Sequence, residues 1–177
     1  MQQQVSVIGL ILLVGAILAL LGVFLDWVTF SGSGVSVSAT GWDLTSGKLM
    51  GVDFMRNLVP LVVIILAVIV IVFAIMDFLG KGNQVMFAVL VIGIVVILLS
   101  FAAYDSFKSI FDMVGGIVPG GIGVDISMGI GIYVEFVAGA ILIIASLLVL
   151  AGVIKEDDPV VSPAETAVIP EETNSNI

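Results

Sequence analysis

The chain has 177 residues, of which 60% are apolar and 11% are charged, and its mean hydropathy is +1.34. This composition excludes an ordinary soluble domain, which could not bury so much apolar surface, and indicates a protein that uses the lipid bilayer as its solvent. The sequence has no cysteine and no histidine, so we expect no disulfide, no thiolate chemistry, no cofactor and none of the common metal sites.

The net charge of −9 is concentrated at the C-terminal end. Residues 155–177 hold six acids and one lysine, which is −5 of the total, and three prolines interrupt them. We therefore predict a disordered acidic tail in the cytoplasm. Residues 1–154 keep eight acids against four bases and offer no basic patch, so nucleic acid is excluded as a partner.

The first apolar segment, residues 5–25, contains no charge and is long enough to cross a bilayer as a helix. A cleaved signal peptide is the alternative, but a basic region is missing and the apolar stretch is longer than a usual signal core. Similar segments follow at residues 58–76, 85–104 and 133–154. We predict an all-α membrane fold, a four-helix transmembrane bundle, over residues 1–154.

The connections between the spans differ in length. The second and third spans are separated by only a few residues and should form an antiparallel hairpin, whereas the outer loops, residues 26–57 and 105–132, are long. Four spans place both termini on one side, but the count of basic residues on the two sides is nearly a tie. We expect cytoplasmic termini in a multi-pass cell-membrane protein, because an acidic tail is easily retained inside and folded loops suit the outer face.

Both long loops carry the alternating pattern of β-strands. Residues 28–40 alternate apolar and small polar side chains around a Gly-rich turn, with Val35, Val37 and Ala39 on one face, and residues 122–132 are apolar at every second position. Because a lone strand is not stable, we expect both segments to pair in a small extracytoplasmic β cap. Residues 104–114 instead continue the third helix.

The two loops also resemble each other in sequence. Residues 32–38 read GSGVSVS and residues 121–127 read GIGVDIS. A duplication of a helix, loop and helix unit would explain the likeness. Convergence of Gly-rich β segments explains it as well.

Small residues recur every seven positions within the spans, a spacing that lets helix backbones approach closely at left-handed crossings. The stripes are Gly15 and Gly22, Ala67 and Ala74, Gly93 and Ser100, and Ala138, Ala145 and Gly152. They could form an oligomer interface, but packing within the bundle is the interpretation we favour, because four helices must pack somewhere.

Glu135 lies one turn into the predicted fourth span, and a carboxylate inside a membrane is a functional candidate by default. It also lies near the outer interface, where its side chain could reach water. Because the cores of the spans supply no second acid, histidine or base, a proton or ion relay through Glu135 is the less favoured interpretation. Asp77 with Lys81, and Asp105 with Lys108, have the spacing of solvated ion pairs at helix ends.

Three aromatic residues at span ends, Trp27, Tyr104 and Tyr133, fit the aromatic belt of membrane proteins. Trp42 lies well beyond the first span, in Gly41-Trp42-Asp43-Leu44. It would either pack the cap onto the bundle, which we favour, or remain exposed as an anchor for a partner.

The pattern resembles the claudin-like tetraspan architecture, with a long first outer loop that carries strands and tryptophan and a second outer loop that adds a strand. Trp42 follows Gly41 here, but the paired cysteines of claudin-type loops are absent. Residues 34–38, GVSVS, and 129–133, GIGIY, are more similar to small four-span proteins of archaea and Gram-positive bacteria. That resemblance covers most of residues 5–154 and implies a fold and a membrane but no activity.

No nucleophile–base pair is evident, so we expect no enzyme. The leading hypothesis is a structural scaffold that associates laterally in the bilayer, as a homo-oligomer or with other membrane proteins, and makes contacts through its outer loops. The alternatives are an accessory or anchoring subunit of a larger membrane complex, and a small channel or transporter subunit.

Overall fold

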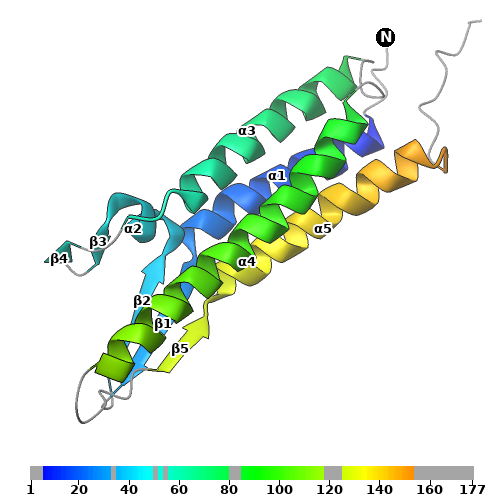
Figure 1. Ribbon diagram of the computed structural model, residues 1–177. Helices are drawn as coiled ribbons and strands as arrows, with labels where there is room; N and C mark the ends of the chain where they lie inside the picture. The colour runs from blue at the N-terminus through cyan, green and yellow to red at the C-terminus, as the bar shows by residue number, and fades with distance from the viewer. Residues whose placement is uncertain are drawn as a thin grey trace, which may run out of the picture.

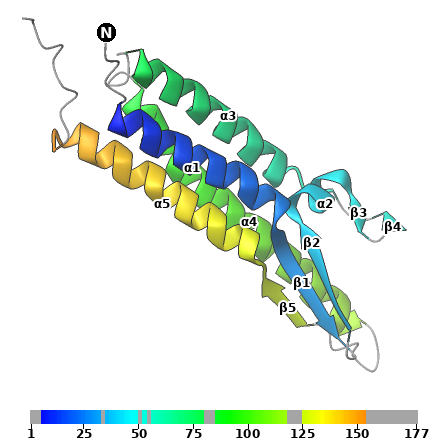
Figure 2. The ribbon, with the colours of Figure 1, turned by 180° about the vertical axis from the view of Figure 1, so that it is seen from behind.

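The computed structural model describes residues 6–32, 35–49, 52–53, 56–79, 85–117 and 125–153. Four long helices lie side by side in a bundle (Figures 1 and 2). They are α1 (Val7–Phe24), α3 (Val59–Phe78), α4 (Met86–Ile117) and α5 (Ile130–Leu150). In the described part of the chain, these four helices are long and apolar enough to cross a membrane, α4 through its segment Met86–Ser109. The predicted four-helix architecture is confirmed at this level.

Local sequence explains where two of these helices begin. The Ser6 side chain accepts a hydrogen bond from the Gly9 N–H and caps the start of α1. Pro60 lies in the first turn of α3, where no backbone donor is needed, as predicted. The start of α1 and the end of α5 lie at one end of the bundle, and the strands lie at the other (Figure 1).

A three-stranded antiparallel sheet of β1 (Asp26–Gly32), β2 (Val35–Thr40) and β5 (Asp125–Met128) caps the second end, with β1 in the centre. Phe30 of β1 pairs with Val37 on one side and with Ile126 on the other. The predicted pairing between the two long loops is therefore confirmed. A short helix, α2 (Gly41–Ser46), and a two-stranded ribbon of β3 (Lys48–Leu49) and β4 (Val52–Asp53) follow β2 and were not predicted.

The strand predicted over residues 122–132 is too long. Its described part is a strand only over Asp125–Met128, and α5 begins at Ile130, three residues before the predicted start of the fourth span. The Gly129 N–H donates to the Trp27 carbonyl at 2.8 Å, and a Cβ on Gly129 would lie 2.1 Å from the Asp26 carbonyl oxygen. The chain turns from strand to helix there because only glycine fits against β1.

The structure also tests the predicted length of the third helix, but some predictions concern residues outside the described part of the chain. The third helix continues past residue 104, as expected, and α4 is described as far as Ile117. The tail at residues 155–177, Lys81 and residues 122–124 lie outside the described residues.

The likeness between the two loops has a counterpart in the sheet. Ser38 of β2 and Ser127 of β5 both pair with Thr29, from opposite sides of β1. A shared central strand requires the same alternation from both neighbours, which accounts for the likeness without a duplication. Duplication itself stays a prediction.

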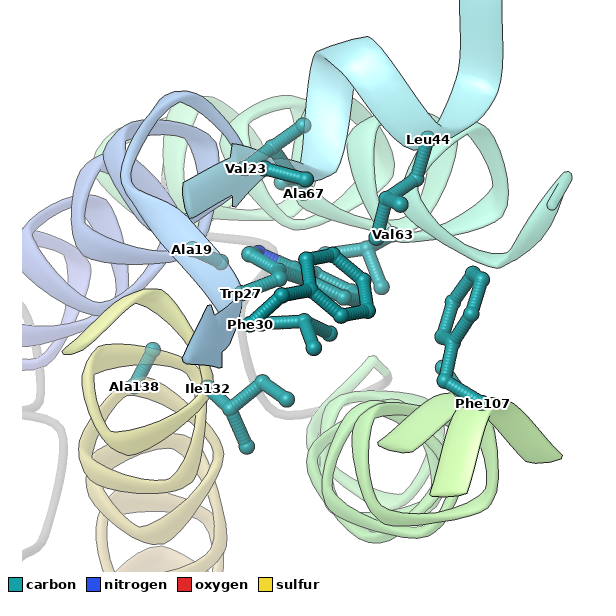
Figure 3. Packing of buried hydrophobic residues seen from close by; sticks show 13 residues of the cluster. Ala19, Val23, Trp27, Phe30, Leu44, Val63, Ala67, Phe107, Ile132 and Ala138 are labelled. Carbon is teal, nitrogen blue, oxygen red and sulfur yellow. The ribbon is translucent and has the colours of Figure 1, made fainter. Parts of the chain in front are cut away.

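The core beneath the cap is built around Trp27 (Figure 3). Its side chain is fully buried and packs in one cluster with Phe30 from the sheet, Leu44 from α2 and Phe107 from α4. The assignment of Trp27 to the aromatic belt is therefore wrong. The chain turns directly from α1 into β1, and this carries Trp27 under the sheet instead of out to the interface.

Candidate functional site

Small residues of the predicted stripes lie between the helices of the bundle. A Cβ on Gly15 of α1 would lie 2.9 Å from Leu142 Cδ2 of α5, and a Cβ on Gly93 of α4 would lie 2.9 Å from the Gly139 carbonyl oxygen. Ala138 and Ala145 are buried in α5 as well. These positions let α1 and α4 approach α5 closely.

Gly152 departs from this pattern. It lies beyond the end of α5 with a φ of 67°, and nothing would lie within 4 Å of an added Cβ. Its conformation is the left-handed one that ends helices, so its role is to terminate α5 and not to pack against a neighbour.

Glu135 is fully buried, with 0% of its surface exposed, so the prediction of an interfacial side chain that reaches water is wrong. Two features place it inside. The helix begins at Ile130, which puts Glu135 more than a turn from the helix start, and the cap covers this end of the bundle. The carboxyl lies against Gly22 of α1, where an added Cβ would be 2.6 Å from Glu135 Oε1.

Trp27 covers the side of this site that faces the cap. Its Nε1–H donates to the Gly22 carbonyl oxygen at 2.9 Å. A Cβ on Gly131 would lie 2.6 Å from Trp27 Cδ1, so the indole rests on Gly131. Because residues four apart share one face of a helix, the indole lies one turn from Glu135 on the same side of α5.

Three buried oxygen atoms in this region have no hydrogen-bond partner: Oε1 and Oε2 of Glu135 and Oγ of Ser100. Ser100 lies on α4, which runs antiparallel to α5 (Figure 1). Gly93 of α4 and Gly139 of α5 mark where the two helices approach each other closely. By the helix rise, Ser100 lies about 10 Å nearer the cap along α4, and Glu135 lies about 6 Å nearer the cap along α5. The two side chains therefore lie at similar depths in the bundle.

A second buried carboxylate lies at the opposite end. Asp77 near the end of α3 is 3% exposed, and the Ser6 hydroxyl donates a hydrogen bond to its Oδ2, while Oδ1 has no partner. The prediction of a solvated Asp77 is wrong, because the side chain turns toward α1, where Gly9 leaves room for it. Asp105 and Lys108 are both exposed on α4, as expected of solvated groups.

Trp42 is 49% exposed and stacks on Phe24, with ring centroids 6.0 Å apart. The prediction that it packs beneath the sheet is therefore wrong. Thr40 and Asp43 form a reciprocal capping box that starts α2 immediately after β2. This helix buries Gly41 and Leu44 and turns Trp42 outward, and Trp27 takes the place beneath the cap.

The sequence analysis selected Glu135 as a candidate but missed the buried hydroxyl of Ser100 at a similar depth on α4 and the Trp27 indole that lies one turn from Glu135. Ser100 did stand out in the sequence as a member of a stripe of small residues. That pattern was interpreted as helix packing alone, and the hydroxyl group was not considered as a ligand. Within the described residues, no three acidic side chains lie together as metal ligands would.

Comparisons with known proteins assign no family. No family model matches the chain, and neither a curated protein nor a solved structure matches it, so the claudin-like resemblance stays a prediction.

Proposed function

We propose that this chain is a non-enzymatic scaffold of the cell membrane, with cytoplasmic termini and an outer β cap that binds a partner protein. The observation that carries the proposal is the exposed edge of the cap sheet. β2 forms one edge of the three-stranded sheet, and no strand in the described part of the chain pairs with its outer side.

The sequence of β2 leaves that edge unprotected. Val35–Thr40 contains no charged residue and no proline, the usual devices that keep edge strands from pairing with other chains. Val35 is 64% exposed, and Ser36 and Ser38 are exposed too. The opposite edge, β5, is shorter and carries an exposed Asp125. β2 thus suits a partner that adds a strand to the sheet.

Lateral association within the bilayer would use the outer faces of the helices, because small residues of the stripes are occupied by packing inside the bundle. Large apolar side chains cover these outer faces. They include Leu10, Ile17, Leu21, Ile65, Val72, Leu98, Val137 and Ile144. Lipid and other transmembrane helices are the natural partners of such surfaces.

The test is cross-linking in the native membrane with a matched pair of variants. Ser38→Lys places a charge on β2 and Ser127→Lys places one on β5, and both residues pair with Thr29. The scaffold proposal expects a defined adduct with the wild-type chain and with Ser127→Lys, and its loss with Ser38→Lys at unchanged thermal stability.

Equal adducts from all three chains would overturn strand addition at β2. Mass determination in lipid nanodiscs then separates the two forms of association. A multiple of the chain mass indicates a homo-oligomer, and a mass that includes another membrane protein identifies a hetero-complex.

A further inference from the structure

Within the described residues, no basic side chain pairs with Glu135. The five bases of the sequence are Lys48, Arg56, Lys81, Lys108 and Lys155. The only one in the described helices is Lys108, which is exposed and lies about 12 Å beyond Ser100 along α4 by the helix rise. A basic residue on a partner helix cannot reach the carboxyl either, because no part of Glu135 is exposed.

An ionised carboxylate in such surroundings is strongly disfavoured unless a positive charge accompanies it. Neither of its oxygens accepts a hydrogen bond. The carboxyl packs against Gly22, and the Trp27 indole rests on Gly131 one turn nearer the cap, so the side chain is held inside the bundle. The positive charge that this site needs must therefore be a small cation held inside the bundle.

We propose that Glu135 is the binding site for a small monovalent cation, a proton or Na⁺, in the core of the bundle. Ser100 Oγ, at a similar depth on the facing helix, supplies a further oxygen for the bound cation. Both cations have the same chemistry here, which is neutralisation of one buried carboxylate by one positive charge.

The other acidic and titratable groups of the described residues lie on other elements, apart from Tyr133 of α5. α1 contains no charged residue, and Glu135 is the only one in α5. Tyr133 is half exposed on α5, and Asp43, Asp53 and Asp125 lie in α2, β4 and β5. Asp26 lies in β1, where its backbone carbonyl approaches Gly131. Tyr104 and Asp105 lie on α4 toward the cap, and Asp77 lies at the opposite end of α3.

The experiment measures thermal unfolding of the full chain in lipid nanodiscs across a pH series. Ionic strength is held constant with choline chloride or with NaCl. The bound cation stabilises the folded chain, so the wild type should lose stability as the pH rises in choline and the proton leaves. If Na⁺ replaces the proton, NaCl restores that stability. If the site takes only a proton, NaCl has no effect.

The matched variants are Glu135→Gln, which keeps the size of the side chain, and Asp77→Asn, which neutralises the other buried carboxylate. Glu135→Gln should remove the loss of stability at high pH and any Na⁺ effect, and Asp77→Asn should keep both. Ser100→Ala should weaken cation affinity by about fivefold, as expected for the loss of one hydrogen-bonding oxygen. Identical pH and Na⁺ profiles for the wild type and Glu135→Gln would overturn the proposal.

A second measurement does not depend on a variant that folds. Dicyclohexylcarbodiimide reacts with protonated carboxyls in apolar surroundings, and peptide mass mapping locates the adduct. The wild-type chain should carry the adduct on Glu135, and the yield should fall as the pH rises or as Na⁺ replaces the proton. An adduct on Asp77 but not on Glu135, or a Glu135 yield that does not respond to pH, rejects the cation site.

Discussion

At the scale of single residues, the missing side chain at Gly22 determines whether Glu135 can be buried. Glu135 fits inside the bundle because α1 has no side chain at Gly22, where a Cβ would be 2.6 Å from the carboxyl oxygen. In turn, the Gly22 carbonyl holds the Trp27 indole above the site. Gly22 thus leaves room for the Glu135 carboxyl and accepts the hydrogen bond that positions Trp27 beneath the cap.

Gly22→Ala should destabilise the protein by about 1–3 kcal/mol, because the added methyl group overpacks the contact with Glu135. Glu135→Ala in the same chain should relieve part of that cost, which gives a coupling of about 0.5–3 kcal/mol in a double-mutant cycle. Unfolding in detergent measures all four chains. The control cycle, Gly15→Ala with Glu135→Ala, should be additive, because Gly15 contacts Leu142 instead.

The two tryptophans offer a second prediction at this scale. Trp27→Phe should cost about 1–3 kcal/mol, because it truncates a fully buried side chain and removes one of the two hydrogen bonds that the Gly22 carbonyl accepts, the other coming from the Leu25 N–H. Trp42→Phe should change stability by no more than about 0.5 kcal/mol, since the side chain is half exposed and the stacking on Phe24 can persist. Equal losses of stability would mean that Trp42 is also part of the core.

At the scale of elements, the cap sheet is one-sided. Ile126 and Met128 of β5 pack against the cluster around Trp27, and Asp125 and Ser127 are exposed on the other face. β5 has only four residues and lies within the alternating segment 122–132 that predicted a strand. The alternation predicts the buried face because a shift of one residue would move every apolar side chain of the strand to the exposed face.

Ile126→Asp should therefore cost several kcal/mol, on the order of 2–5, because it places a charge without a partner against the core. Ser127→Asp on the outer face should be nearly neutral. Thermal unfolding in detergent compares the two variants directly. Similar melting temperatures for both would show that β5 does not bury one face in solution.

At the scale of the whole molecule, the bundle has two different ends. α2 and the cap lie at one end, and the close of α5 lies at the other (Figures 1 and 2). A membrane that contains the four spans therefore separates these two ends. The absence of native cysteine makes the arrangement simple to test with introduced thiols.

Ser46→Cys in α2 should react with a membrane-impermeant maleimide on intact cells, whereas Val153→Cys should react only after permeabilisation. Ser46 is exposed at the cap end, and Val153 is 69% exposed beyond the end of α5. Mass shift on denaturing gels reads out both labels. The reverse pattern would place the termini outside, and labelling of both on intact cells would rule out this four-span topology.

Sequence alone determined the elements whose physical requirements are local. Four uncharged apolar segments of membrane length specify four helices wherever they pack, and alternation specifies which face of β5 turns inward. The pairing of the two loops also followed from sequence, because spans of even number bring both loops to one side and a lone strand is unstable.

Only the tertiary structure determined which side chains near the ends of helices and strands are buried. Trp27 is buried beneath the cap and Trp42 is half exposed, the reverse of the burial predicted for them, because a one-residue connection after α1 and a capping box before α2 set directions that hydropathy does not encode. Glu135 looked interfacial until an early helix start and the cap buried it. Burial of a single side chain depends on contacts between segments far apart in the chain, such as Gly22 and Glu135, and periodicity carries no information about those contacts.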